Sequence, residues 1–183
     1  LAGLFFVCAT GQTAPMPIQT LYRLAELPPA EWDALLSDDQ PFLRHAFLCT
    51  LEDSGSVGGR SGWQPAHRLL RDPQGALQAA LPLYRKFHSY GEYVFDWAWA
   101  DACQRAGIAY YPKLLCAVPF TPVTGNRLLG DVQAAGELLD VLTAGLERQE
   151  LSGLHVNFSE QQTDQLLAGR DGWLERIGCQ FHW

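Results

Sequence analysis

The sequence predicts an α+β domain in which helices flank a mixed and mostly antiparallel sheet. Residues 66–71 and 76–86 have the apolar character of strands, and the Asp-Pro-Gln-Gly turn at 72–75 joins them as a hairpin. Residues 128–151 carry an apolar stripe at helical spacing and form the longest helix. Residues 153–158 then return as a strand. Elements in this order predict one sheet that is covered by helices.

Length and composition place the chain among globular proteins of one domain. It has 183 residues, 48% of them apolar and 18% charged, and no apolar run reaches the ~20 residues of a membrane-spanning helix. Thirteen Lys and Arg stand against twenty Asp and Glu, a formal net charge of −7 without any basic run. We therefore expect no membrane insertion and no nucleic-acid partner, and the acidic balance favours a cationic or uncharged partner.

The five cysteines are odd in number, widely spaced and without a Cys-x-x-Cys pair, which fits neither a disulfide framework nor a zinc site. We expect reduced thiols, no metal and a cytoplasmic protein. Cys103, with His88 as its base, is one candidate nucleophile. The alternative is that Cys103 is a small packing residue.

The chain begins with an apolar segment, residues 1–15, that lacks a charged flank and precedes the only methionine, Met16. We expect this segment to be a disordered or non-native extension, with a single domain over residues 16–183. A strand-like pattern starts at Pro17, immediately after the methionine.

Two short helices are expected next. Residues 28–36 begin with two prolines and carry apolar residues at helical spacing, and residues 42–51 follow another proline with the same spacing. The Gly- and Ser-rich residues 54–62 predict a loop that is flexible enough to move over a site.

The rest of the chain alternates helices and strands. Residues 97–106 predict a helix. Residues 113–123 form an apolar strand that contains Pro119 and Pro122. Proline cannot donate to a strand ladder, so this strand must lie at an edge, bulge, or diverge from its neighbour. A helix and a final strand complete the pattern, over residues 161–167 and 179–183.

Residues 84–111 contain nine Phe, Trp and Tyr residues, with His88, Glu92, Asp96 and Asp101 set among them. A half-buried strand needs aromatic residues on one side only. The excess of rings with interleaved acids fits the wall of a ligand pocket, where apolar surface is combined with a few polar groups. The alternative is an aromatic core with solvated acids.

The order of these elements matches that of acyltransferases of the GNAT superfamily. The sequence contains the distinctive blocks HSYGEYVFDWAWA (88–100), YYPKL (110–114) and VPFTPVTGNRLL (118–129), with PFLRHAFL (41–48) and GWQP (62–65) before them. Through these blocks the sequence resembles, from about residue 32 to its C-terminus, the FemAB-like family of bacterial peptidoglycan biosynthesis or recognition proteins.

The resemblance implies a GNAT-like fold and transfer of an acyl or aminoacyl group to an amine. In GNAT-like proteins the donor lies in a gap between diverging strands, here residues 118–124 and 153–158, and the helix after Gly125 could present N-terminal amides to an anion. The superfamily loop R/Q-x-x-G-x-G/A is absent, which fits Fem-type enzymes and their different donor, so acyl-CoA and an aminoacyl donor both stay open. The expected donor-binding residues are Phe120, Thr121, Val123, Thr124, Gly125, Asn126 and Arg127.

An acceptor amine must lose a proton before it attacks, so a carboxylate or histidine must lie within reach. Glu92 and Asp96 are four residues apart in a segment expected to be extended, which would place both on one face of a strand. We expect Glu92 to act as base or amine anchor, Asp96 to orient it, and His155 to be the alternative base. We expect one cavity beside the strand gap to be lined by Glu92, Asp96, Tyr90, Thr121 and His155. The other expected acceptor-binding residues are His88, Tyr93, Trp97, Tyr111 and Lys113.

Two classes of function follow from these patterns and the resemblance. The first is an acyl- or aminoacyl-transferase that acts on a muropeptide or a similar small amine. The second is a catalytically silent module that recognises a peptide or glycan and needs a second lobe. Family members commonly hold two GNAT-like lobes, so we expect this chain to match the first lobe and to self-associate or meet a second lobe.

Overall fold

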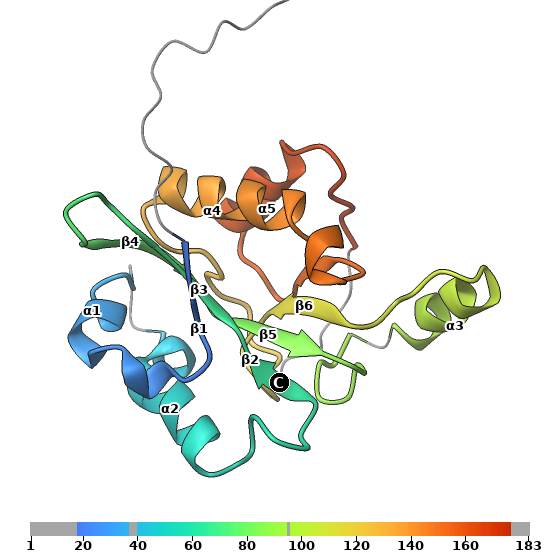
Figure 1. Cartoon of the computed structure of the whole chain (residues 1–183), viewed down its shortest axis with the longest axis horizontal. Helices are drawn as coiled ribbons and strands as arrows, with labels where there is room; N and C mark the ends of the chain where they lie inside the picture. The colour runs from blue at the N-terminus through green and yellow to red at the C-terminus, as the bar shows by residue number, and fades with distance from the viewer. Residues whose placement is uncertain (1–17, 37–39, 95, 177–183) are drawn as a thin grey trace, which may run out of the picture.

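The computed structural model describes residues 18–36, 40–94 and 96–176. The expected extension 1–15 and the expected strand 179–183 lie outside this part of the chain. The helices are α1 (Pro29–Asp33), α2 (His45–Asp53), α3 (Trp97–Arg105), α4 (Val132–Ala144) and α5 (Gln161–Ala168), with short 3-10 helices η1 (Leu24–Glu26), η2 (Pro41–Leu43) and η3 (Glu147–Gln149). Helices α1 and α2 lie on one side of the sheets and α4 and α5 on the other (Figure 1).

The described strands form two four-stranded sheets, which confirms the predicted α+β class and is consistent with a GNAT-like fold. Sheet A is antiparallel throughout, in the order β1 (Ile18–Leu21), β3 (His67–Arg71), β4 (Leu77–Leu81) and β7 (Leu129–Gly130). Sheet B has the order β2 (Trp63–Pro65), β5 (Leu83–Lys86), β6 (Lys113–Cys116) and β8 (Leu154–Val156). Within sheet B, β6 and β8 run parallel and the other neighbours run antiparallel.

The predicted hairpin runs through both sheets. The strand expected over residues 76–86 is divided at Pro82, with β4 in sheet A and β5 in sheet B. Proline has no amide hydrogen for a ladder, which makes it a natural point of division. On the other arm of the hairpin, Ala66 separates β2 from β3, and its amide donates to the carbonyl of Leu83 at 2.8 Å. This division adds β2, a strand that the sequence did not predict, and β2 pairs with β5 in sheet B.

Helices cover both faces of sheet A. Successive side chains of its strands point in opposite directions, so they are buried in two separate cores. Leu70 belongs to a core with Leu138 of α4, whereas its neighbour Leu69 belongs to a second core with Trp32 of α1. Each fully buried side chain of this kind contributes about 1.5–3 kcal/mol. The two cores hold sheet A between the helices and leave sheet B to carry the polar residues described below.

The long helix is shorter at both ends than the predicted 128–151. Residues 129–130 form β7 instead, and a side chain on Gly130, which has φ +90°, would meet the carbonyl oxygen of Gln78 at 2.2 Å. The helix starts only after Asp131, whose carboxylate accepts a hydrogen bond from the amide of Ala134 at 2.9 Å. The expectation that this helix presents free amides to an anion beside Gly125 is therefore wrong, because β7 intervenes and an acid caps the helix.

Strands β6 and β8 are paired in parallel over the full length of β8, and the backbone ladder is interrupted only beyond them, where the proline pair predicted that residues 118–124 would part from residues 153–158. The last bond of their ladder joins the amide of Asn157 to the carbonyl of Cys116 at 3.0 Å, and contact returns only where the amide of Gly125 donates to the carbonyl of Phe158 at 3.0 Å. The strand expected over 113–123 therefore ends at Cys116. Residues 117–124 form a loop, because Pro119 and Pro122 cannot supply amides to a neighbouring strand.

Helix α3 agrees with its predicted range to within one residue and stands apart from the other helices (Figure 1). None of its residues is buried. Among the described residues, no helix has the length and apolar character that a membrane crossing needs.

Replacing Asp131 with alanine tests the cap of α4. The amide of Ala134 loses its acceptor, so the free energy of unfolding should fall by about 1 kcal/mol in urea titrations. Glu137→Ala is the matched control, because Glu137 is an exposed acid inside the same helix. Equal effects of the two substitutions would contradict a capping role.

Candidate functional site

A row of three side chains crosses sheet B. Trp63 of β2 is paired in register with Lys86 of β5, and Lys86 is paired with Lys113 of β6. Residues directly opposite one another in an antiparallel pair point to the same face. Both lysines are 0% exposed, and two like charges opposite each other are destabilising. Carboxylates must therefore lie close by.

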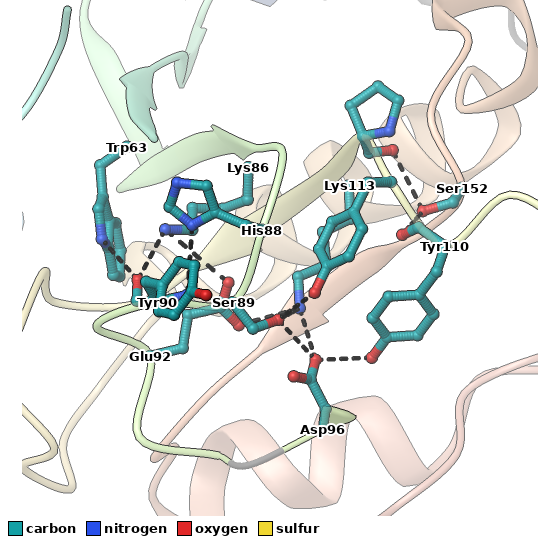
Figure 2. A network of polar contacts seen from close by, with 12 residues as sticks. Trp63, Lys86, His88, Ser89, Tyr90, Glu92, Asp96, Tyr110, Lys113 and Ser152 are labelled. Carbon is teal, nitrogen blue, oxygen red and sulfur yellow. Dashed lines mark hydrogen bonds and ion pairs between the residues drawn. The ribbon is translucent and has the colours of Figure 1, made fainter. Parts of the chain in front are cut away.

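Lys113 bonds to two such carboxylates. Its Nζ donates to Glu92 Oε2 at 2.9 Å, to Asp96 Oδ2 at 2.8 Å and to Ser89 Oγ at 3.0 Å (Figure 2). Glu92 and Asp96 are only 2% and 3% exposed. We refer to Lys86, Lys113, Glu92 and Asp96 as the ion network.

Lys86 is held by weaker contacts. Its Nζ lies 3.9 Å from the centre of the Trp63 ring, donates to the carbonyl of Tyr90 at 3.1 Å and is 3.9 Å from Glu92 Oε1. The ring face attracts the ammonium charge. Burial nevertheless lowers the pKa of Lys86 to about 8, although the charge of Glu92 acts in the opposite direction. Lys86 therefore gives up its proton more readily than an ordinary lysine.

Asp96 accepts three hydrogen bonds on one oxygen. Lys113, Ser89 and the hydroxyl of Tyr110 donate to its Oδ2 at 2.8, 2.9 and 2.7 Å. Burial alone would raise the pKa of Asp96, but these hydrogen bonds outweigh it and hold the pKa at about 2. Since Ser89 gives its proton to Asp96, the Tyr111 hydroxyl, 2.7 Å away, donates to Ser89. The carboxylate is therefore ionised throughout the neutral range.

Each carboxylate has one oxygen that is buried and, among the described residues, has no hydrogen-bond partner. These atoms are Glu92 Oε1 and Asp96 Oδ1. Leaving such a group unpaired costs about 1–3 kcal/mol, so its presence calls for a partner, which can be a water molecule or a ligand, or for a catalytic use. Burial also raises the pKa of Glu92, with the charge of Lys113 opposing it. The site offers two acceptor oxygens that a donor such as an ammonium group would satisfy.

Glu92 and Asp96 meet in a way that the sequence did not predict. Between β5 and α3 the described residues form no helix or strand, so the two carboxylates do not share a strand face. The chain instead turns through Gly91 at φ +77° and Tyr93 at φ +59°. A side chain on Gly91 would meet the ring of Phe120 at 2.6 Å, so glycine is required there. The turn, rather than strand spacing, brings the carboxylates together.

His155 lies on the same face of sheet B, opposite Leu115. Its ring packs edge-on against Tyr110 with a centroid distance of 5.7 Å. Burial and, to a lesser extent, the charge of Lys113 lower its pKa to about 4, so the imidazole is neutral at pH 7. Its connection to Asp96 runs through the ring of Tyr110.

Aromatic rings form the solvent side of the site. His88 packs on Tyr90 at a centroid distance of 4.9 Å, and Tyr90 packs on Trp97 at 5.2 Å. Tyr90 is 64% exposed and Trp97 is 48% exposed. Tyr93 is exposed as well. Of these rings, Trp97 also lines a groove beside the site, together with the expected residue Tyr111. Glu92, Asp96, Tyr90, Thr121 and His155 do not line that groove.

The expected donor-binding residues lie in the loop between β6 and β7. Phe120 packs on Trp63 at a centroid distance of 5.4 Å, and Thr121 donates to the carbonyl of Pro119 at 3.0 Å. Asn126 Oδ1 accepts from the amide of Leu128 at 2.9 Å. Val123 and Thr124 are exposed, and Gly125 is buried where the loop rejoins the segment after β8.

Arg127 fills the space between the loop after β6 and the end of β8. It is 1% exposed, and its guanidinium donates to the carbonyls of Asn157 at 2.9 Å, Asn126 at 3.2 Å and Val123. These contacts tie the loop to the end of β8. In this arrangement Arg127 faces backbone oxygens rather than solvent.

Several residues of the site were not found by sequence reasoning: Trp63, Lys86, Ser89, Tyr110 and Asn157. A charged residue at the end of an apolar strand could have pointed to Lys86, but only the strand register places it beside Lys113. The side-chain nitrogen of Asn157 is buried and has no hydrogen-bond partner within the described part of the chain. It therefore supplies a spare donor just after β8, where residues 117–124 leave the ladder.

Comparison with known proteins gives one match. The model of the FemAB-like family, described as peptidoglycan biosynthesis/recognition, matches residues 23–183. No curated protein and no solved structure matches the chain.

Removal of the Lys113 ammonium leaves two buried carboxylates without their main partner. Lys113→Met should therefore lower the free energy of unfolding by about 3–5 kcal/mol. Urea titration measures the loss. Arg105→Met is the control, because it breaks an exposed ion pair with Asp101 and should cost no more than about 0.5 kcal/mol. A loss for Lys113→Met as small as that of the control would contradict the central role of Lys113.

Asp96 predicts an acid dependence of stability. Its pKa of about 2 in the folded protein lies below the ordinary 3.8, so its contribution is complete above the ordinary pKa and disappears as the pH falls toward 2. Unfolding measured between pH 6 and pH 2.5 should show a smaller loss of stability for Asp96→Asn than for the unmodified chain. The same loss in both proteins would show that Asp96 does not titrate as described.

Proposed function

Since the chain belongs to the FemAB-like family of peptidoglycan biosynthesis or recognition proteins, we propose that it binds an amine-bearing peptidoglycan precursor and takes part in acyl or aminoacyl transfer to that amine. The observation that carries the proposal is the pair of buried carboxylate oxygens, Glu92 Oε1 and Asp96 Oδ1, that have no hydrogen-bond partner among the described residues. An ammonium group is the natural partner for two such acceptors.

In the proposed reaction Glu92 is the base. The raised pKa of its carboxyl makes it a better proton acceptor than an exposed glutamate, and Lys113 keeps it in place. The ammonium gives one proton to Glu92, and the nitrogen then attacks the carbonyl carbon of the donor. A bond forms between nitrogen and that carbon, the bond to the leaving group breaks, and the leaving group accepts the second proton that the nitrogen loses as it becomes an amide. Asp96 stays ionised and anchors the acceptor.

Access to the carboxylates is through the aromatic cover. Both oxygens are buried, so the acceptor must displace part of this cover, and Tyr90, Tyr93 and Trp97 are exposed members of it. The neutral imidazole of His155 is the alternative base, since it lies across the ring of Tyr110 from Asp96.

The donor, acyl-CoA or an aminoacyl carrier, is proposed to lie between the loop after β6 and the segment that follows β8. The spare amide donor of Asn157 supports this placement, because a developing negative charge on the carbonyl oxygen needs a donor. A cytoplasmic location is proposed with it, and the free thiols of Cys49, Cys103 and Cys116 support that location.

A second function, recognition of the precursor without transfer, is favoured by Arg127. Its buried guanidinium occupies the space between the loop after β6 and the end of β8, and it donates hydrogen bonds to three backbone carbonyls there. In this alternative the carboxylates still bind the amine, but no donor enters.

Calorimetric titration with a muropeptide and with acetyl-CoA, followed by mass spectrometry of mixtures, separates the two functions. We expect the muropeptide to bind, and Glu92→Gln to weaken that binding by about tenfold because a neutral amide attracts an ammonium less strongly. Glu137→Gln makes the same change on the exposed face of α4 and should have no effect. Unfolding measurements must show that both variants fold.

Each outcome has a distinct meaning. A modified muropeptide formed with acetyl-CoA or with an aminoacyl donor supports transfer, whereas binding without product with either donor supports recognition. Unchanged binding by Glu92→Gln would exclude Glu92 as the amine anchor.

A further inference from the structure

A groove of about 450 Å³ lies beside the ion network, between α3 and the segment that follows it. We propose that this groove binds a sugar unit of the peptidoglycan precursor, an inference that rests on the proposed function and adds a second contact to it. The volume lies within the range of about 300–1,000 Å³ that ligand sites occupy. The groove is lined by Trp97, Ala100, Asp101, Gln104, Ile108, Ala109, Tyr110 and Tyr111.

The aromatic side of the groove suits the apolar face of a sugar ring. Trp97 continues the surface formed by Tyr90 and His88, with ring centroids about 5 Å apart. Because α3 has no buried residue, the exposed part of Trp97 does not belong to a core. A pyranose presents axial C–H groups on one face, and these pack on an exposed indole as other apolar groups do.

The polar side of the groove suits neutral hydroxyl groups. Asp101 forms an ion pair with Arg105 at 3.1 Å, so the rim carries no net charge there. Gln104 offers both a donor and an acceptor. Since neither a cation nor an anion gains from a neutral rim, the groove favours an uncharged ligand with hydroxyl or acetamido groups over a charged peptide side chain.

Two tyrosines connect the groove to the carboxylates. Tyr110 and Tyr111 line the groove, and their hydroxyls bond to Asp96 and Ser89 at 2.7 Å each. A sugar in the groove would therefore place its attached peptide beside Asp96. This arrangement explains why the aromatic surface extends past the ion network onto α3.

Calorimetric titration with two probes tests the sugar site: di-N-acetylchitobiose, a neutral disaccharide without an amine, and a stem peptide without sugar. We expect the disaccharide to bind, and Trp97→Ala to weaken that binding by about tenfold, the scale of one aromatic contact. Gln104→Ala should weaken it as well. Trp99→Ala is the matched control, because Trp99 is an exposed tryptophan of the same helix that does not line the groove.

The two probes separate this inference from the proposed function. Binding of the disaccharide that depends on Trp97 supports the sugar site even if the stem peptide fails to bind, in which case only the amine site is wrong. Binding of the stem peptide alone would overturn the sugar site and leave the amine site intact. Absence of disaccharide binding, or equal losses for Trp97→Ala and Trp99→Ala, would overturn the sugar site.

Discussion

The contact between Lys113 and the two carboxylates is the interaction on which the rest of the site depends. Moving an isolated charge into a protein interior costs several kcal/mol, and two lysines on neighbouring strands add mutual repulsion. The arrangement is tolerated because Glu92 lies within ion-pair distance of both ammonium groups and Asp96 bonds to Lys113. In turn, the carboxylates fix the segment between β5 and α3, which carries the exposed aromatic residues.

Asp96 shows that this interaction outweighs a local preference. It occupies the N-cap position of α3, where an aspartate would normally accept a hydrogen bond from the first turn, yet its side chain makes no capping bond. Its Oδ2 is used by Lys113, Ser89 and Tyr110 instead. Natural sequences break local rules of this kind chiefly at functional sites, which agrees with an acceptor site at the network.

Local patterns predicted most of the fold, and tertiary contacts explain the remainder. The proline pair correctly predicted that the ladder is interrupted at residues 118–124, because proline supplies no amide to a neighbouring strand. The same property of Pro82 was overlooked, and only the pairing of β4 and β5 with different neighbours shows its effect. The start of α4 was missed because Leu129 has helical spacing but pairs with β4.

For the site, the aromatic stretch indicated Glu92 and Asp96, Lys113 was one of the expected acceptor-binding residues, and the structure brings these three together. The reason given for the pairing of the carboxylates was wrong, since a turn at Gly91 and Tyr93 joins them. Lys86 and Ser89 could not be identified, because their role follows from cross-strand register and from side-chain hydrogen bonds that no spacing rule describes.

The central claim is that the two carboxylates receive the amine of the acceptor. Its most direct test is calorimetric titration at pH 7 with two muropeptides that differ only in whether the acceptor amine is free or acetylated. An acetylated amine has no charge and fewer hydrogens to donate, so the account predicts that the free amine binds more tightly by about tenfold or more. Equal affinities for the two muropeptides would contradict it.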